Sequence, residues 1–227
     1  MEWWVFVPLI AGFIALAVWN YRQKRKRIKA LEELAKVRRL LFDPSERHGV
    51  DDEYPQFSCL ARGEDRYAFN CLSGDWEKRE LFAFDYHYET YSTDSKGRRQ
   101  THHHYFSAVI VTSDVPLKPL FLRPESFLDR VGEFFGFDDI DFESAEFSRR
   151  FYVKSPDRRW AYDVLHQRTM EFLLHSPNFY IEFGPRGVIA YRHATFAVAE
   201  FEAAAEVASG ILNCLPEYLV KQQTGRS

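Results

Sequence analysis

Residues 81–113 read LFAFDYHYETYSTDSKGRRQTHHHYFSAVIVTS, and they predict one long β-hairpin. Aromatic and β-branched residues dominate both halves of the stretch, as is typical of strands. The tetrapeptide Asp94-Ser95-Lys96-Gly97 between the halves is rich in turn formers, so we expect Ser95 and Lys96 at the centre of the turn. The segments that follow have helical and shorter strand patterns, and these would cover the sheet that the hairpin begins.

The order of the predicted elements indicates the fold class. Strand-rich sequence comes first and mixed sequence later, which favours an α+β domain with one antiparallel sheet over a doubly wound parallel sheet. Apolar periodicity predicts about three helices covering this sheet, over residues 125–135, 155–175 and 195–215. Hydrophobic residues make up 46% of the 227-residue chain, which is enough for a packed core and argues against disorder.

The first residues have the composition of a membrane-spanning helix. Residues 3–19, WWVFVPLIAGFIALAVW, carry no charge and would span roughly 25 Å as a helix, close to the roughly 30 Å apolar core of a bilayer. Aromatic residues that favour the headgroup region lie at both ends of the run, namely Trp3, Trp4, Trp19 and Tyr21. We therefore expect a single transmembrane helix. A cleaved signal peptide is the alternative, but neither a positively charged start nor a small-residue cleavage site is present.

A basic cluster follows the apolar run and predicts its orientation. Because positively charged flanks stay on the cytoplasmic side, we expect the inner membrane as the location, with the N-terminus outside and the folded domain in the cytoplasm. The cluster is also expected to bind anionic lipid of the inner leaflet, or else to act as a topology signal alone. Its members are Arg22, Lys24, Arg25, Lys26 and Arg27.

The domain organisation follows from these features. We expect a transmembrane anchor, a basic juxtamembrane helix, a polar linker, a cytoplasmic α+β domain and a tail, over residues 1–21, 22–43, 44–55, 56–220 and 221–227 respectively. Apolar residues with heptad-like spacing mark one side of the juxtamembrane helix, namely Ala30, Leu34, Val37 and Leu41. This pattern is too short for a coiled coil on its own, so the helix would dock on the domain or, alternatively, form a homo-oligomer.

Charge and cysteine usage limit the classes of partner. Outside the basic segment the chain is acidic, which argues against nucleic acid as a partner. The expected partner is a protein, which the sequence does not identify, or a ligand near the membrane lipid. Cys59, Cys71 and Cys214 lack CxxC spacing, so they are expected to be free core thiols, with a Cys59–Cys71 bridge as the alternative.

The histidines of the hairpin are candidate metal ligands. If the turn centres on Ser95 and Lys96, His87 pairs with His104 and Glu89 pairs with His102, which places these four side chains on one face. Three imidazoles and a carboxylate suit zinc or another divalent ion. A register slip of one residue would exchange the faces, and an ordinary half-exposed strand face is the alternative. His103 would lie on the opposite face, with a packing role only.

An acidic segment is a second candidate site. In an extended segment Asp139, Asp141 and Glu143 line one side, where they would bind a cation or a basic partner. The spacing of an EF-hand is absent, and a solvated acidic face is the alternative.

Signatures of catalysis are missing from the sequence. It contains no GxSxG, P-loop or HExxH motif, so no catalytic residue and no cofactor is expected beyond the possible divalent metal. The predicted function is a membrane-tethered cytoplasmic binding or interaction module. The alternative is a metal-dependent, hydrolase-like enzyme that uses the His/Glu cluster of the hairpin.

Four short motifs carry a resemblance to a known family. They are FDYHY (residues 84–88), LRPE (122–125), DIDF (139–142) and FSRRF (147–151). In this order they resemble a family of uncharacterised bacterial proteins that are commonly predicted to be membrane-anchored. The resemblance covers residues 81–192 and implies a bacterial, membrane-anchored domain. It implies no activity, cofactor or catalytic residue.

Overall fold

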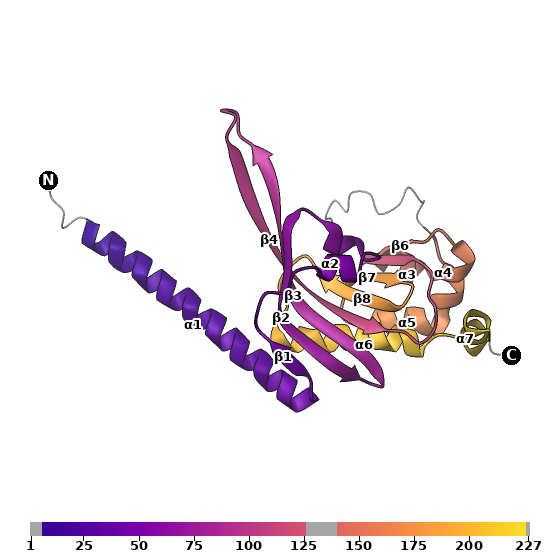
Figure 1. Ribbon diagram of the computed structural model, residues 1–227. Helices are drawn as coiled ribbons and strands as arrows, with labels where there is room; N and C mark the ends of the chain where they lie inside the picture. The colour runs from indigo at the N-terminus through magenta and orange to yellow at the C-terminus, as the bar shows by residue number, and fades with distance from the viewer. Residues whose placement is uncertain (1–5, 126–139, 226–227) are drawn as a thin grey trace.

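The computed structural model describes residues 6–125 and 140–225, which form an α+β fold around one sheet (Figure 1). The described strands are β1 (Leu41–Asp43), β2 (Glu64–Trp76), β3 (Arg79–Thr93), β4 (Arg99–Thr112), β5 (Leu120–Pro124), β6 (Phe151–Lys154), β7 (Tyr180–Gly184) and β8 (Gly187–Arg192). The described helices are α1 (Phe6–Arg38), α2 (Val50–Glu53), the 3-10 helix η2 (Ser58–Ala61), α3 (Ala145–Arg150), α4 (Arg158–Val164), α5 (Gln167–His175), α6 (Val198–Asn213) and α7 (Glu217–Thr224).

The sheet has eight strands in the order β1-β2-β3-β4-β8-β7-β5-β6, and all neighbouring strands are antiparallel. The predicted antiparallel sheet is therefore confirmed. β3 and β4 are the long central hairpin that the sequence predicts, and their joined ends project beyond the rest of the sheet (Figure 1).

The register of this hairpin differs from the predicted one by a single residue. Glu89 pairs with His103, and Tyr88 pairs with His104. The reason is a five-residue loop between Thr93 and Arg99, in which the Asp94 carboxylate accepts hydrogen bonds from two backbone N–H groups further along the loop. The prediction assumed a loop of even length, and one additional residue moves every pairing by one position.

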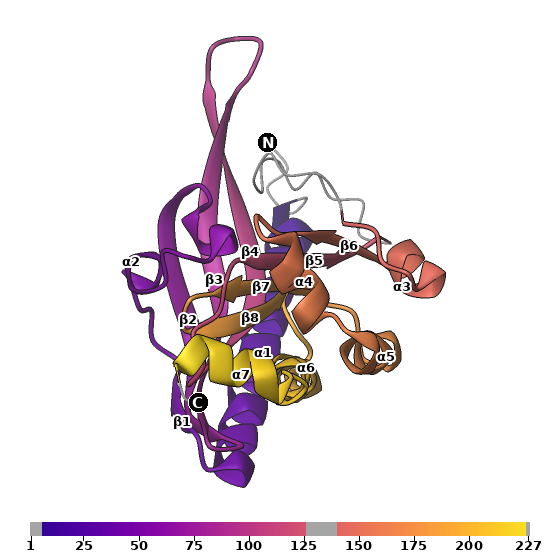
Figure 2. The ribbon, with the colours of Figure 1, turned by 90° about the vertical axis from the view of Figure 1, so that its right-hand side faces the viewer.

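Two groups of helices pack on opposite faces of the sheet (Figure 2). One face, which we call the α6 face, is covered by α6 and the second half of α1, and it includes Ala83 and Val109. The other, the α2 face, is covered by α2 and η2, and it includes Phe84 and Ala108. Alternation along β3 and β4 separates these two cores, because neighbouring strand residues point to opposite faces.

The structure corrects the prediction of a transmembrane helix. Within the described part of the chain, no helix combines the length and the apolarity that a membrane crossing requires. α1 is one continuous helix that runs from its apolar part directly into the basic residues from Arg22 onward. The single transmembrane anchor is therefore wrong. The inner-membrane location, with the N-terminus outside and the domain in the cytoplasm, depended on that anchor and is wrong with it.

The second half of α1 docks on the sheet. Docking is the interpretation that the sequence favours over self-association. The buried residues of this half of α1 are Leu31 and Ala35, whereas Val37 of the predicted heptad face is 75% exposed. Of residues 44–55, expected as a linker, Val50 to Glu53 form α2, and Arg47 bridges to β2 through its backbone. This segment therefore covers the sheet.

The predicted covering helices have three different outcomes. Most of the first, residues 126–135, lies outside the described residues. The second, residues 155–175, is two helices, because α4 ends at Val164 and α5 begins two residues beyond Leu165. The third is present as α6, whose inward side includes Phe201 and Ala204. The expectation of about three covering helices undercounts, since six α-helices are described besides α1. All three cysteines are free and buried, as predicted.

Candidate functional site

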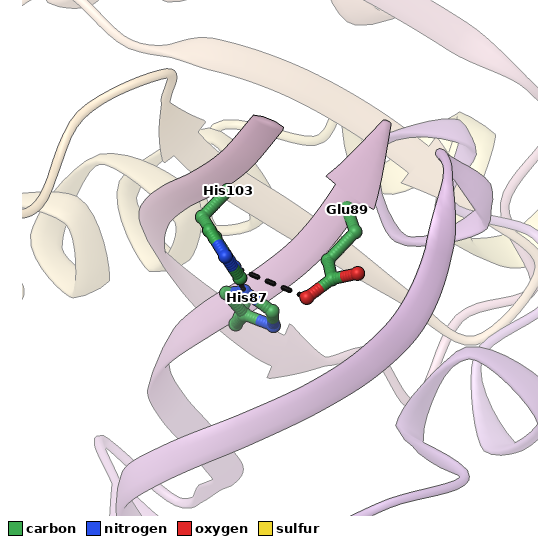
Figure 3. Close-up of side chains that lie close together, drawn as sticks. All are labelled: His87, Glu89 and His103. Carbon is green, nitrogen blue, oxygen red and sulfur yellow. Dashed lines mark hydrogen bonds and ion pairs between the residues drawn. The ribbon is translucent and has the colours of Figure 1, made fainter. Parts of the chain in front are cut away.

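Three potential metal ligands meet where the β3–β4 hairpin leaves the body of the fold (Figure 3). They are His87 and Glu89 of β3 and His103 of β4. His87 Nε2 lies 3.0 Å from His103 Nδ1, and that same Nδ1 lies 3.1 Å from Glu89 Oε1. The corrected register causes this arrangement, because His103 lies directly across from Glu89 and the two share a face with His87.

Neighbouring groups hold two of these side chains in place. The Asp65 carbonyl lies 3.1 Å from His87 Nδ1, and it belongs to an irregular stretch of β2 between Glu64 and Tyr67. Because a carbonyl only accepts, His87 Nδ1 carries the proton, and its Nε2 presents a lone pair to His103. Tyr91 donates a 2.9 Å hydrogen bond to Glu89 Oε2, which leaves Oε1 directed at His103. His87 is 2% exposed, whereas the side chain of His103 is 54% exposed, so the cluster has a buried side and an open side.

His102 and His104 of the predicted metal set lie on the opposite face. His104 stacks on Tyr88, with ring centroids 4.7 Å apart, and its Nε2 lies 2.8 Å from the Thr90 hydroxyl. His102 Nε2 lies 2.7 Å from the Ser92 hydroxyl. Burial, followed by repulsion from neighbouring histidines, lowers the pKa of His104. The structure therefore brings together only His87 and Glu89 of the predicted four, and it adds His103, to which the sequence gave no role.

The other predicted site residues are scattered. Trp3, Trp4 and Asp139 lie outside the described residues, and Asp141 and Glu143 are exposed in the loop before α3. That loop and α3 replace the expected extended segments, because the Ser144 hydroxyl accepts from the Phe147 N–H and begins a helix. A cation-binding or docking role for the acidic residues stays a prediction.

The predicted anchor residues lie along α1 and differ in their surroundings. Trp19 and Tyr21 are exposed, as are the first four cations of the basic cluster. The fifth cation, Arg27, is an exception, because it forms an ion pair with Asp85 of the FDYHY motif. Anionic lipid binding by this cluster and homo-oligomer formation stay predictions.

The Asp85 carboxylate is the centre of a buried polar network. It is 1% exposed and accepts hydrogen bonds from Asn70 at 2.8 Å and from the Ser107 hydroxyl at 2.5 Å, besides those from Arg27. Arg27 also donates to the Phe196 carbonyl, just before α6. The network joins α1, the sheet and the start of α6, so its role is structural.

A groove lies on the α2 face, at the end of the sheet opposite the hairpin tip. Its first part, which we call the polar basin, has a volume of about 700 Å³ and is lined by the β2–β3 turn, the β7–β8 turn and α2. Charges of both signs surround it, including the cations Lys78, Arg79 and Arg186 and the carboxylates Asp75, Glu80 and Asp114. This volume is within the range of small-molecule sites.

A second part, which we call the apolar basin, continues from the polar one and has a volume of about 350 Å³. The two share Tyr54, Ile110, Thr112 and the carboxylates Asp75 and Glu80. The apolar basin adds Leu41 and Phe82 on its apolar side and Arg47 and Ser73 on its polar side. Leu41 is 76% exposed, so an apolar side chain is in contact with solvent at the rim of the apolar basin. Tyr54 stacks on Phe82 at a centroid distance of 6.0 Å, and burial raises the pKa of Tyr54 to about 12.

This groove could not be predicted from the sequence. Its lining comes from turns and from residues 44–55, which read as a polar linker and not as part of the sheet's cover. The available signals were Val50 and Tyr54, two residues of apolar character in a mostly polar segment.

The comparisons with known proteins yield one similar fold. The architecture is an eight-stranded antiparallel sheet with α1 and α6 on one face and α2 on the other. This fold is similar to that of the crystal structure of the mycobacterial trehalose monomycolate transport factor A, TtfA, at a TM-score of 0.60 and 13% identity. The match covers 86% of this chain and 97% of that one. No protein-family model and no curated protein matches the sequence, so the family resemblance stays a prediction.

Proposed function

We propose that this chain is a non-catalytic binding module whose ligand is an amphipathic, sugar-headed lipid held in the groove of the α2 face. The observation that carries the proposal is the direct continuation of a polar basin into an apolar one. An amphipathic molecule needs both environments in contact, with its headgroup in one and its chain along the other.

The charges of the polar basin favour an uncharged headgroup. Carboxylates and cations both line it, so a strongly charged ligand would meet repulsion as well as attraction. A polyhydroxylated ring suits such a lining, because its hydroxyl groups donate to Asp75 and Glu80 and accept from Arg79 and Arg186. The Tyr54 ring provides a flat apolar surface between the basins.

The similar fold gives independent support for this ligand class. TtfA is a transport factor for trehalose monomycolate, a sugar-headed lipid, according to its description. A role in the transport of such a lipid is consistent with binding that leaves the ligand unchanged.

The test is calorimetric titration of the full chain with trehalose and with trehalose monomycolate as probes. We expect the glycolipid to bind one to one and trehalose to bind more weakly, because it lacks the acyl chain. Leu41→Asp should weaken glycolipid binding at least about tenfold, the loss expected for one apolar contact of roughly 1.4 kcal/mol. It should leave the weaker trehalose binding unchanged.

Val37→Asp is the matched control, since Val37 is equally exposed but lies on α1, outside the groove. Arg186→Ala should weaken the binding of both probes. Arg149→Ala is its control, because Arg149 is exposed and lies on α3. The proposal fails if neither probe binds, or if Val37→Asp weakens binding as much as Leu41→Asp.

A further inference from the structure

We infer that His87, Glu89 and His103 form a binding site for a divalent transition metal, with zinc as the best-matched ion. This site is separate from the groove and does not depend on the ligand proposed for it. The geometry of the three donor atoms is the first argument. Zinc binds imidazole nitrogen and carboxylate oxygen at about 2.0–2.2 Å, so neighbouring ligands of a tetrahedral site lie roughly 3.3 Å apart.

The donor atoms come close to that spacing. The distances from His103 Nδ1 to His87 Nε2 and to Glu89 Oε1 are 3.0 and 3.1 Å, and all three ligand atoms lie within 4.8 Å of one another. Only a small outward movement of the ligands is needed to admit an ion. His103 provides this freedom, because its side chain is 54% exposed.

The protonation pattern fits a metal site as well. His87 Nδ1 donates to the Asp65 carbonyl, so His87 Nε2 and both oxygens of Glu89 are acceptors. One proton on His103 Nδ1 therefore faces two acceptors at once. A bound cation takes the position of that proton, and His103 then carries its proton on Nε2.

The outer partners of the ligands are those that metal sites use. Ligating histidines usually donate their other N–H to a carbonyl or carboxylate, as His87 does to Asp65. Tyr91 holds the second oxygen of Glu89 in the same manner. Three protein ligands leave a fourth position open to water or to a donor atom of another molecule, and the exposed side of His103 gives access to it.

The test is titration of the full chain, without a polyhistidine tag, with ZnCl₂ by calorimetry and with CoCl₂ by visible absorption. We expect one equivalent of each metal, and cobalt bands of the intensity that tetrahedral coordination gives. His103→Ala and Glu89→Gln each remove one ligand and should weaken zinc binding by more than about 100-fold. Tyr91→Phe removes the hydrogen bond that orients Glu89 and should weaken zinc binding about tenfold.

His102→Ala and His104→Ala are the matched controls, because both residues belong to the same strand and face the other way. They should leave zinc affinity unchanged. Circular dichroism of each variant shows whether it is folded, and the exposure of His103 makes its replacement compatible with folding. The inference is overturned if the chain binds no stoichiometric zinc, or if the controls weaken binding as much as His103→Ala.

Discussion

Arg27 and Asp85 lie 58 residues apart in the chain and meet in a two-point ion pair between α1 and β3. Arg27 Nε lies 3.1 Å from Asp85 Oδ2, and Nη2 lies 2.7 Å from Oδ1. The Arg27 side chain is 26% exposed and the Asp85 side chain is 1% exposed. The pair therefore fixes the long first helix to the centre of the sheet.

Loss of the Arg27 side chain should destabilise the fold. Arg27→Ala leaves the Asp85 carboxylate buried without its cation, and breaking such a pair costs about 3 kcal/mol in the free energy of unfolding. Urea denaturation measures this, with Lys26→Ala as the control because Lys26 is exposed. Asp85→Asn should lower the free energy of unfolding much less when Arg27 is already alanine than it does in the wild-type protein. Equal stability of Arg27→Ala and wild type would contradict the structural role of the pair.

The hairpin register can be tested with an engineered disulfide. Ser92 pairs directly with Gln100, so the variant Ser92→Cys/Gln100→Cys should form a disulfide on mild oxidation. In Ser92→Cys/Arg99→Cys the two side chains point to opposite faces and should remain reduced. Mass spectrometry after thiol alkylation separates the outcomes. Preferential bridging of the second pair would restore the register that the sequence suggested, and it would separate His103 from Glu89.

Glycine substitutions in two turns should change the free energy of unfolding in opposite directions. Lys78 has a φ of 68°, a left-handed conformation that costs a residue with a side chain roughly 1 kcal/mol. Lys78→Gly should therefore raise the free energy of unfolding by up to about 1 kcal/mol. Gly97 has a φ of 75° with open space around it, so Gly97→Ala should lower stability by a similar amount through backbone strain alone. Thermal melts of both variants are the measurement, and a shift of the same sign in both would contradict the assignment of the turns.

The buried Glu182 should make stability depend on pH. It is 1% exposed, and burial raises its pKa above 4.5, although hydrogen bonds from Tyr191 and Ser58 oppose that shift. A carboxyl group with a raised folded pKa stabilises the fold fully below its unfolded pKa. That contribution is lost as the pH rises through the folded pKa.

Glu182→Gln cannot ionise, so it separates this effect from that of other carboxyl groups. Its stability deficit relative to wild type should be largest at about pH 4 and should shrink as the pH rises toward 7. Urea denaturation of both proteins across this range is the measurement. A deficit that grows with pH would show that the charged form of Glu182 is the stabilising one.

Local patterns in the sequence were sufficient to predict the central hairpin, the antiparallel sheet and α6. Residues 81–113 alternate strongly enough that tertiary context reinforces their preference for strands. Docking of residues 22–41 was also foreseen, although the buried face, with Leu31 and Ala35, is set by the sheet and α6 and not by the heptad pattern.

The candidate sites were harder to predict because they depend on single-residue geometry. One additional loop residue after Thr93 places His103, in place of His102 and His104, on the same face as His87 and Glu89. The amino-acid composition of the hairpin cannot reveal this difference. The groove depends on turns distant in sequence, at Lys78 and Arg186, and on the cover formed by residues 44–55. The membrane anchor was inferred from an apolar run alone, whereas the described part of α1 continues as the same helix into charged residues, and no described helix has the length and apolarity that a crossing requires.

Binding of a glycolipid without chemical change is tested by native mass spectrometry of the full chain with trehalose monomycolate. We expect a complex of one chain and one ligand, from which the ligand is recovered with its mass unchanged after prolonged incubation, with or without added zinc. Absence of the complex, or the release of free trehalose in a reaction that depends on the chain, would contradict the proposed function.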